Sequence, residues 1–373
     1  MPEAQDVVTL LVDGEELSGF KSVNIISSLE TLCGSFEVTL ADKLDGKNFK
    51  LKTQSSCVVK IGSDTIITGF IDRVTPKFDA RSHSVVIKGR DKTADLVDSS
   101  IETPPLEYGK NQDLFKLVQK WVAPHSITVI KDYDIVPKFP QKLAVSLGET
   151  CAEVIIRACR MKGIIPITDG TGRLLLTASG GELSDDSLAY EVNVKAGEAD
   201  YDYANRFYKY TFRTQNNNED EVIAELWNRS LEVSGSATDP SIKRQNRKVV
   251  LDAEHDATRD ECKKRAEVEA LVRAANGQTA SVTVQGWRQS TGKLWKKNMI
   301  VPVDIPPLYI NQELLISEVS YTLGEDGSES TLKLVRPDAF NPGTKFKIPR
   351  RSGVSSATPN GSIKKQAETG FGF

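Results

Sequence analysis

The stretch TIITGFIDRV at residues 65–74 is followed, after a polar turn, by the short apolar run SVVIK at residues 84–88. A long run rich in β-branched and aromatic residues, a turn and a second apolar run together predict an antiparallel hairpin. The same layout returns at residues 313–322 and 330–335. A duplicated β-domain and two unrelated hairpins both explain this echo, and the sequence leaves the two open.

The residues around the first hairpin also favour strands. Residues 7–12, 35–40 and 57–61 are short runs of strand-forming residues, and Asp13-Gly14 is a hairpin turn signal. Short strands joined by Gly and Asp turns, without a long helix, predict a small barrel or sandwich. We assign this first β-barrel domain to residues 1–98.

Residues 99–180 have a different pattern. A helical stripe of Leu114, Leu117, Val118 and Trp121 stops at Pro124. A second helix is predicted to open with the capping box Ser146-x-x-Glu149 and to place apolar residues on one face; these are Cys151, Val154, Ile155, Ala158 and Cys159. Residues 164–168 and 173–177 flank a Gly-rich turn and predict a hairpin. The stretch therefore predicts an inserted module that mixes helices and strands.

Residues 181–340 predict a second β-barrel domain. Strand patterns lie at 207–212, 280–284 and 299–305, in addition to the second hairpin. A helix is predicted over 258–275, opening with the capping box Thr258-x-x-Glu261. Four small side chains on it form one row, Cys262, Ala266, Ala270 and Ala274. Such a row allows close packing on a sheet of the same chain, which we favour, or on a neighbouring subunit.

The composition limits the classes of function. The chain has 373 residues, enough for two or three domains, and a net charge of −3, which excludes a chain-wide basic field for nucleic acid. Residues 341–373 carry six Lys and Arg against one Glu and predict a flexible basic tail of charge +5. No run approaches the roughly 18 uninterrupted apolar residues of a membrane span. The first residues lack a secretory pattern, so we expect the chain to begin in a cytoplasm.

The cysteines and histidines do not form a recognisable catalytic or metal-binding pattern. The five cysteines include no C-x-x-C, and Cys151 and Cys159 lie too far apart on a helix to bridge, so we expect buried thiols. His83, His125 and His255 lie in three separate regions, and the common hydrolase, dinucleotide and phosphate-loop motifs are missing. An acidic run at residues 219–221 is better interpreted as a solvated loop than as a glycosidase pair. We predict no catalytic residue, cofactor or metal ligand.

One cluster admits a nucleic-acid interpretation. Trp287 and Trp295 are interleaved with the cations Arg288, Lys293, Lys296 and Lys297. Aromatic and basic side chains combine in this way on barrels that bind single-stranded nucleic acid. The alternative, which we favour, is that the two tryptophans bracket a hairpin turn at 289–292 and anchor it to a core.

Two stretches resemble a known family. The first contains Thr68-Gly69-Phe70-Ile71-Asp72 and continues through Gly89-Arg90-Asp91-Lys92-Thr93-Ala94-Asp95-Leu96-Val97-Asp98. The second contains Val284-x-Gly286-Trp287 and Gly292-x-Leu294-Trp295-x-x-Asn298. Both resemble the baseplate hub proteins of Mu-like contractile-tailed bacteriophages, and the resemblance is collinear from about residue 5 to residue 340. It implies structural roles for Gly89, Arg90, Lys92, Asp95, Trp287 and Trp295.

The resemblance implies a fold and a set of partners. It implies a mainly β, α+β chain with two tail-tube-like barrels around the inserted module. Three such chains are expected to form a ring, a homotrimer between a sixfold tail tube and a trimeric spike. DNA is expected to pass through the lumen without sequence-specific binding, in a virion baseplate assembled in the host cytoplasm. No cofactor, no membrane insertion and no cell-wall hydrolase activity are implied.

A ring of barrels must bury or cover its sheet edges. We therefore expect packing between subunits on the predicted helix and on the long strands, with these candidate residues: Cys262, Ala266, Ala270, Ala274, Ile67, Phe70, Leu315 and Val319. Two other functions stay open from the sequence. They are a single-stranded nucleic-acid-binding barrel and a cell-wall-degrading tail enzyme.

Overall fold

The computed structural model describes residues 6–41, 52–80, 83–102, 106–109, 112–132, 138–139, 143–160, 164–215, 232–252 and 259–340. Four features predicted from the sequence lie outside these ranges. They are the acidic run at 219–221, His255, the Thr258 cap and the basic tail at 341–373.

The described residues up to Asp91 form antiparallel strands. They are β1 (Val8–Val12), β2 (Glu15–Leu17), β3 (Ser22–Ser28), β4 (Ser35–Ala41), β5 (Ser56–Ile61), β6 (Asp64–Phe78) and β7 (His83–Asp91). Their hydrogen-bonding order is β3-β4-β7-β6-β5-β1-β2. Buried and partly exposed residues alternate along β1, β4 and β5, because successive side chains of a strand point to opposite faces of the sheet. The strands predicted from the sequence in this region are confirmed.

The C-terminal part contains a second set of strands. These are β17 (Val194–Asp200), β21 (Thr279–Gln285), β22 (Met299–Ile305), β23 (Ile310–Gly324) and β24 (Gly327–Val335). They pair in the order β17-β21-β24-β23, and β22 pairs with the first half of β23. Two short strands, β15 (Glu182–Leu183) and β16 (Leu188–Ala189), run parallel to β22.

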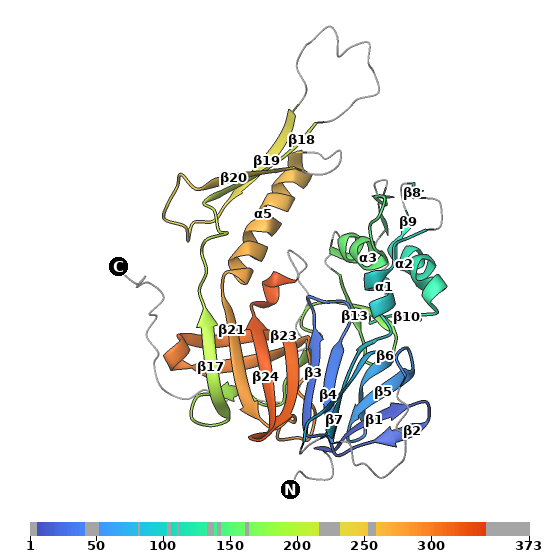
Figure 1. The fold of residues 1–373 in the computed structure, drawn as a ribbon. Coiled ribbons are helices and arrows are strands. Elements are labelled where there is room, and N and C mark those ends of the chain that lie inside the picture. Colours follow the sequence, from blue (N-terminus) through green and yellow to red (C-terminus); the bar gives the residue numbers. More distant parts are fainter. Residues whose placement is uncertain are drawn as a thin grey trace.

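The two sets are joined into one 14-stranded sheet. The joint is the antiparallel pairing of the second half of β23 with β3, from Glu318 opposite Ser28 to Leu323 opposite Val23. A single hydrophobic cluster crosses the joint and includes Ile25 from one side and Tyr321 from the other. Figure 1 shows the continuous sheet, with β17 at its left end and β5 and β6 on the right. The chain is therefore mainly β, with few helices.

The two sets repeat the same arrangement. The long strands β6 and β23 each have 15 residues, and the strands that follow, β7 and β24, each have 9. Each hairpin has one irregularity, between Ile71 and Arg73 in β6 and between Ile316 and Glu318 in β23. The other neighbours correspond as well, because β4 and β21 flank β7 and β24 while β5 and β22 pair with the first half of the long strand. The predicted echo is therefore a repeat of five strands in the same chain order, β3 to β7 in the first set and β17, β21, β22, β23 and β24 in the second.

A helical module lies above the first set of strands (Figure 1). Its helices are α1 (Ala94–Asp98), α2 (Leu114–Val122) and α3 (Cys151–Arg160), and its three-stranded sheet contains β10 (Val129–Lys131), β13 (Ile165–Thr168) and β14 (Leu174–Thr177). Two short pairs complete it, β8 (Glu107–Tyr108) with β12 (Leu143–Ala144) and β9 (Gln112–Asp113) with β11 (Lys138–Phe139). The predicted apolar faces of α2 and α3 form its core, which also contains the two thiols of α3.

One capping prediction is wrong by a turn. Helix α3 begins at Cys151, and its capping box is Thr150-x-x-Glu153. The Thr150 amide donates to the Glu153 carboxylate at 2.8 Å, and the Glu153 amide donates to the Thr150 hydroxyl at 3.2 Å. In the predicted pair, the Ser146 amide donates to the Glu149 carboxylate at 3.0 Å, but these two residues lie in the loop before the helix. Both spacings match the motif, so the sequence pattern alone does not distinguish them.

A second α/β unit projects from the sheet between β17 and β21 (Figure 1). It contains β18 (Lys209–Gln215), β19 (Glu232–Thr238), β20 (Lys248–Asp252) and the long helix α5 (Arg259–Asn276). Cys262, Ala266 and Ala270 pack with Tyr210 and Phe212 of β18. The row of small side chains therefore packs on a sheet of the same chain, the interpretation favoured from the sequence. The separate sheet itself was not predicted. Three short 3₁₀ turns, at Ala123–His125, Pro306–Leu308 and Pro337–Ala339, complete the described elements.

The close approach of β6 to β7 gives a test of the fold. A Cβ atom at Gly69 would lie 2.0 Å from the Arg90 carbonyl oxygen and 2.5 Å from the Asp91 Cα, both of them backbone atoms. We expect Gly69→Ala to lower the free energy of unfolding by about 3 kcal/mol, measured by denaturant titration, because the strands must separate. Gly324→Ala is the control, since no atom lies within 4 Å of that Cβ. Equal stability of the two variants would contradict the packing.

Candidate assembly surfaces

The segment from Gly89 to Asp98 connects the sheet to the helical module. At Gly89, a Cβ atom would lie 2.3 Å from the Phe70 carbonyl oxygen and 2.6 Å from the Phe36 ring. Only glycine therefore lets β7 pass between these two neighbours. Lys92 donates to the Ser126 carbonyl at 2.8 Å in the helical module. Asp95 lies in the first turn of α1, and its carbonyl accepts from the Ser99 amide at 3.1 Å.

Arg90 links the irregularity in β6 to α1. Its guanidinium donates to Asp72 at 2.8 Å and to both oxygens of Asp98 at 3.1 and 2.7 Å. The hydrogen bond from Arg90 lowers the pKa of the Asp98 carboxyl. The fork geometry of arginine suits this double contact, which a lysine cannot reproduce. Arg90 and Lys92 thus link β7 to its surroundings through their side chains, whereas the hydrogen bond of Asp95 is made by its backbone.

A buried carboxylate in the same segment was not singled out from the sequence. Asp91 is 1% exposed and accepts from the Gly34 amide at 2.6 Å and from the amide and hydroxyl of Thr93. Burial raises the pKa of the Asp91 carboxyl, and these hydrogen bonds oppose the rise. Nearby, burial lowers the pKa of Lys297 to about 8, and its ammonium donates to the Ser28 carbonyl at 3.1 Å. Asp91 holds the loop between β3 and β4 against the end of β7.

The two tryptophans of the second motif are buried. Trp287 is 1% exposed and Trp295 is 2% exposed. The Trp287 indole donates to the carbonyls of Thr322 and Glu329 at 3.1 and 3.0 Å, and the Trp295 amide donates to the Trp287 carbonyl at 3.1 Å. They bracket the turn at 289–292 as favoured. Bases stack only on accessible rings, so the single-stranded nucleic-acid alternative loses the platform on which it rested.

Arg288, between these tryptophans, joins the two sets of strands. It donates to Asp6 at 3.0 Å, to Asp64 at 2.8 Å and to the Ile61 carbonyl at 3.1 Å, all in the first set. Its own hairpin supplies a fourth acceptor, the Gly292 carbonyl at 2.8 Å. The side chain is 14% exposed, so these bonds are partly shielded from water. Arg288, one of the cations in the nucleic-acid interpretation, therefore binds the two sets of strands together.

Most candidates for packing between subunits are buried inside the protomer. Ile67 is 1% exposed, and four others, Leu315, Val319, Cys262 and Ala266, have no exposed surface. Side chains without exposed surface cannot touch a second subunit. These buried residues therefore make no direct contact between subunits, contrary to the expectation from the sequence. Ala270 and Ala274 are each 9% exposed. Phe70 is half-buried and stays a candidate.

Two of the sheet edges are candidates for assembly. Strand β17 ends the sheet, and its residues 195–198 are all exposed. The last residues of β6 pair with β7 on one side, whereas β5 follows β6 only as far as Phe70. In the described part of the chain, no strand covers the other side of residues 73–78. Phe78, at the end of this edge, is 82% exposed. Unpaired edges of this kind accept further strands.

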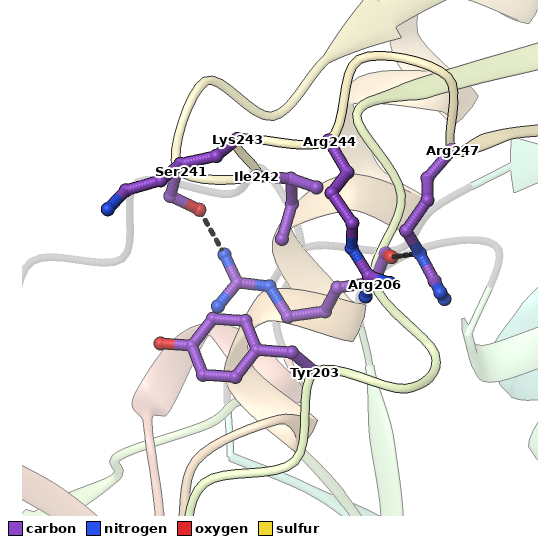
Figure 2. Close-up of a pocket in the computed structure, with 7 residues that line it drawn as sticks. All are labelled: Tyr203, Arg206, Ser241, Ile242, Lys243, Arg244 and Arg247. Atoms are coloured by element: carbon purple, nitrogen blue, oxygen red, sulfur yellow. Dashed lines mark hydrogen bonds between the residues drawn. The ribbon is translucent and has the colours of Figure 1, made fainter. Parts of the chain in front are cut away.

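A shallow basic pocket lies on the projecting α/β unit (Figure 2). Arg206, Lys243, Arg244 and Arg247 line it together with Tyr203. Arg206 forms an ion pair with Asp239 at 2.7 Å, and its guanidinium lies 4.6 Å from the centre of the Tyr203 ring. Arg247 donates to the Arg206 carbonyl at 3.1 Å. Arg206 and Arg247 thus hold the loop in place, and the exposed Lys243 and Arg244 give its rim a positive charge.

One cysteine lies near a histidine. The Cys151 sulfur is 3.8 Å from His125 Nε2, but the residue is 2% exposed and burial raises the pKa of its thiol. A buried thiol with a raised pKa is not an activated nucleophile. Across the described ranges, no group of three or more His, Cys, Asp or Glu is placed to hold a metal ion. None of the helices described is long and apolar enough to cross a membrane.

Together, a repeated β-arrangement, motif residues that serve packing, and open sheet edges define a structural assembly protein. Three family models match the chain in order. The N-terminal domain of Mu phage GpP-like baseplate assembly proteins matches residues 7–91, and the second domain of gp44-like baseplate hub proteins matches residues 93–178. The fourth domain of Mu phage baseplate assembly protein GpP matches residues 258–343. The chain belongs to the baseplate hub proteins of Mu-like phages, which are components of the phage tail.

Individual proteins agree with this assignment. The baseplate hub protein gp44 of Escherichia phage Mu is 28% identical over 352 residues, which cover 90% of this chain and 89% of the relative. The 43 kDa tail protein of prophage MuSo2 from Shewanella oneidensis is 29% identical, with a TM-score of 0.78 over 90% of this chain and all of the other. A type VI secretion component of E. coli, described as similar to T4 tail proteins gp27 and gp5, shares the fold at 11% identity, with a TM-score of 0.53 over 91% of this chain and 80% of the other.

The junction residue Arg288 gives a second prediction. Arg288→Ala leaves two carboxylates and two carbonyls without this donor, so we expect the free energy of unfolding to fall by about 2–3 kcal/mol in denaturant titrations. The control is Lys293→Ala in the same hairpin, which removes a contact of 3.1 Å to Asp185 from an exposed side chain. Its loss should cost less than about 1 kcal/mol. An Arg288 variant as stable as the control would remove this residue from the joint.

Proposed function

We propose that the protein is the structural hub of a contractile phage tail and acts as a homotrimer. The ring adapts the sixfold tail tube to the trimeric central spike and forms the channel through which DNA leaves. Each subunit contributes two tube-like β domains, 1–98 and 181–340, around the inserted module at 99–180. The chain is not an enzyme on this proposal.

The observation that carries the proposal is the repeat of five strands. Three chains with two similar β-units each present six similar units around one axis. A ring with threefold symmetry can then match a sixfold tube on one face and a trimeric partner on the other.

The charge and the partners follow from the same proposal. A net charge of −3 suits a channel that DNA passes without sticking, because binding to phosphates requires clustered cations. The likeness of the fold to a protein described as similar to the T4 tail proteins gp27 and gp5 supports a place in the tail. The virion baseplate is the location, and assembly takes place in the cytoplasm of the host bacterium.

The oligomeric state tests this proposal. Light scattering should give the mass of three chains, and negative-stain images should show a threefold ring with a central hole. The expected trimer depends on concentration, because self-association follows mass action. A protein that is monomeric at all concentrations, alone and with its spike, would contradict the hub.

The absence of catalysis is tested separately. The pure protein incubated with peptidoglycan should release no more sugar or peptide ends than buffer does, with a lysozyme as the positive control. Turnover that persists through repeated purification and depends on pH would indicate a working carboxylate. That result would revive the cell-wall-degrading alternative and contradict a purely structural role.

A further inference from the structure

The chain contains a template for how one β-unit joins the next. Inside the protomer, β3 of the first set adds to the exposed half of β23 in the second set. The equivalent half of β6 in the first set has no strand there in the described part of the chain. Likewise, β17 takes the place of β3 in the second set, and its outer edge is open. One joint between β-units is therefore made within the chain. The outer edge of β17 is left as a strand that can add to another sheet, and residues 73–78 of β6 are left as an edge that can receive such a strand.

The registers on both sides of the repeat determine which residues correspond. In the hairpins, Lys88 faces Arg73 and Lys333 faces Glu318, each directly after the irregularity. Arg73 therefore corresponds to Glu318, and Phe78 corresponds to Leu323. This equivalence follows from strand pairing alone and needs no sequence similarity.

The donor strands correspond in the same way. Glu37 of β4 faces Lys88, and Ser281 of β21 faces Lys333, so Glu37 and Ser281 are equivalent. Their neighbours on the next strand are Asn24 of β3 and Glu198 of β17. Asn24 therefore corresponds to Glu198, and Ser28 corresponds to Asp202.

We propose that β17 of one copy of this chain adds antiparallel to residues 73–78 of β6 in a second copy, as β3 adds to β23 within the chain. The register transferred from that internal joint sets Arg73 opposite Asp202, Val74 opposite Tyr201, Thr75 opposite Asp200, Pro76 opposite Ala199, Lys77 opposite Glu198 and Phe78 opposite Gly197. This inference rests on the proposed homotrimer and names the surface that closes it.

The side chains match in this register. Both basic residues of the acceptor edge, Arg73 and Lys77, meet an acid, and all four side chains are exposed in the protomer. Opposite charges directly across a strand pair are stabilising, whereas a register shifted by one residue sets Lys77 opposite Ala199 or Gly197 and loses this pairing. Charge complementarity thus selects the register that the internal template gives.

The apolar side chains match as well. Val74 and Ala199 are partly buried against the main hydrophobic cluster, each at its own end of the sheet. Strand addition covers both. Phe78 is 82% exposed and falls opposite Gly197, next to Leu308, whose Cδ1 lies 3.0 Å from the position of a Cβ at Gly197. Leu308 thus covers Gly197, and in the transferred register the phenyl ring of the second copy meets this leucine side chain.

The acceptor edge also carries features that limit unwanted pairing. Pro76 has no backbone N–H, so β6 offers one donor fewer than β23, which has Tyr321 at the equivalent place. Proline and lysine on an edge strand discourage nonspecific sheet extension. An acid opposite Lys77 on the partner strand offsets part of the free energy lost with the hydrogen bond that Pro76 cannot donate. This contact favours pairing with β17 over other edges.

A cross-link between copies tests the register. Cysteines placed directly opposite on paired strands are within reach of a disulfide. In the variant Thr75→Cys with Asp200→Cys, mild oxidation should give covalent dimers and trimers on non-reducing gels. The control is Thr75→Cys with Ala199→Cys, whose second thiol points to the other face of the sheet and should link at least about tenfold less. The wild-type protein controls for its five native cysteines, four of which are buried.

A charge reversal tests the pairing independently. Lys77→Glu sets two acids opposite each other and should raise the concentration for half-assembly about tenfold. Adding Glu198→Lys restores an opposite pair and should return assembly to that of the wild type. The restoration distinguishes a direct contact from a general effect of charge, because the double variant has the net charge of the wild type.

The possible outcomes separate this inference from the proposed function. Trimers that neither cross-link at these cysteines nor respond to Lys77→Glu overturn the strand pairing and leave the hub intact. Equal cross-linking of the test pair and the Ala199 pair overturns the register. If the wild-type protein stays monomeric at every concentration and the variant Thr75→Cys with Asp200→Cys does not cross-link, both the strand pairing and the proposed homotrimer are overturned.

Discussion

The backbone pairing of β23 with β3 is the constraint on which the rest of the structure depends. It joins strands from opposite ends of the chain into one sheet and makes their apolar faces one continuous core. Without it, each β-unit would have one more exposed edge, and an exposed edge is open to unwanted pairing. Arg288 adds a second link between the two units, through charged hydrogen bonds to Asp6 and Asp64 of the first unit.

The motif residues hold neighbouring strands and loops of each β-unit together. Gly69 and Gly89 let β6, β7 and β4 approach closely, and Arg90 and Asp91 fix the strand ends to the loops and to α1. The buried charge of Asp91 is costly, but it is satisfied by amide and hydroxyl donors, so it favours one arrangement of the β3–β4 loop. The same logic explains why Trp287 is buried with its indole nitrogen hydrogen-bonded.

The additional units extend the sheet without interrupting it. The helical module leaves the first unit directly after β7, and the projecting unit leaves between β17 and β21. Each has its own hydrophobic core, so each can be accommodated between two strands of the sheet. In the view of Figure 1 both units lie above the sheet.

Local patterns in the sequence predicted many of the strands, the buried faces of α2 and α3, and the echo of the two hairpins, because side-chain periodicity reflects which face of an element is buried. They did not predict β3, β17 or β20. The small residues of α5 were also interpreted correctly, since Cys262 and Ala266 pack on β18. The start of α3 was misplaced because two capping boxes stand four residues apart. Only the tertiary structure decided that Leu315 and Val319 are internal, that Arg288 spans the two units, and which edges stay open. Pairing between strands distant in sequence has no local signal, because it depends on the register of every strand between them.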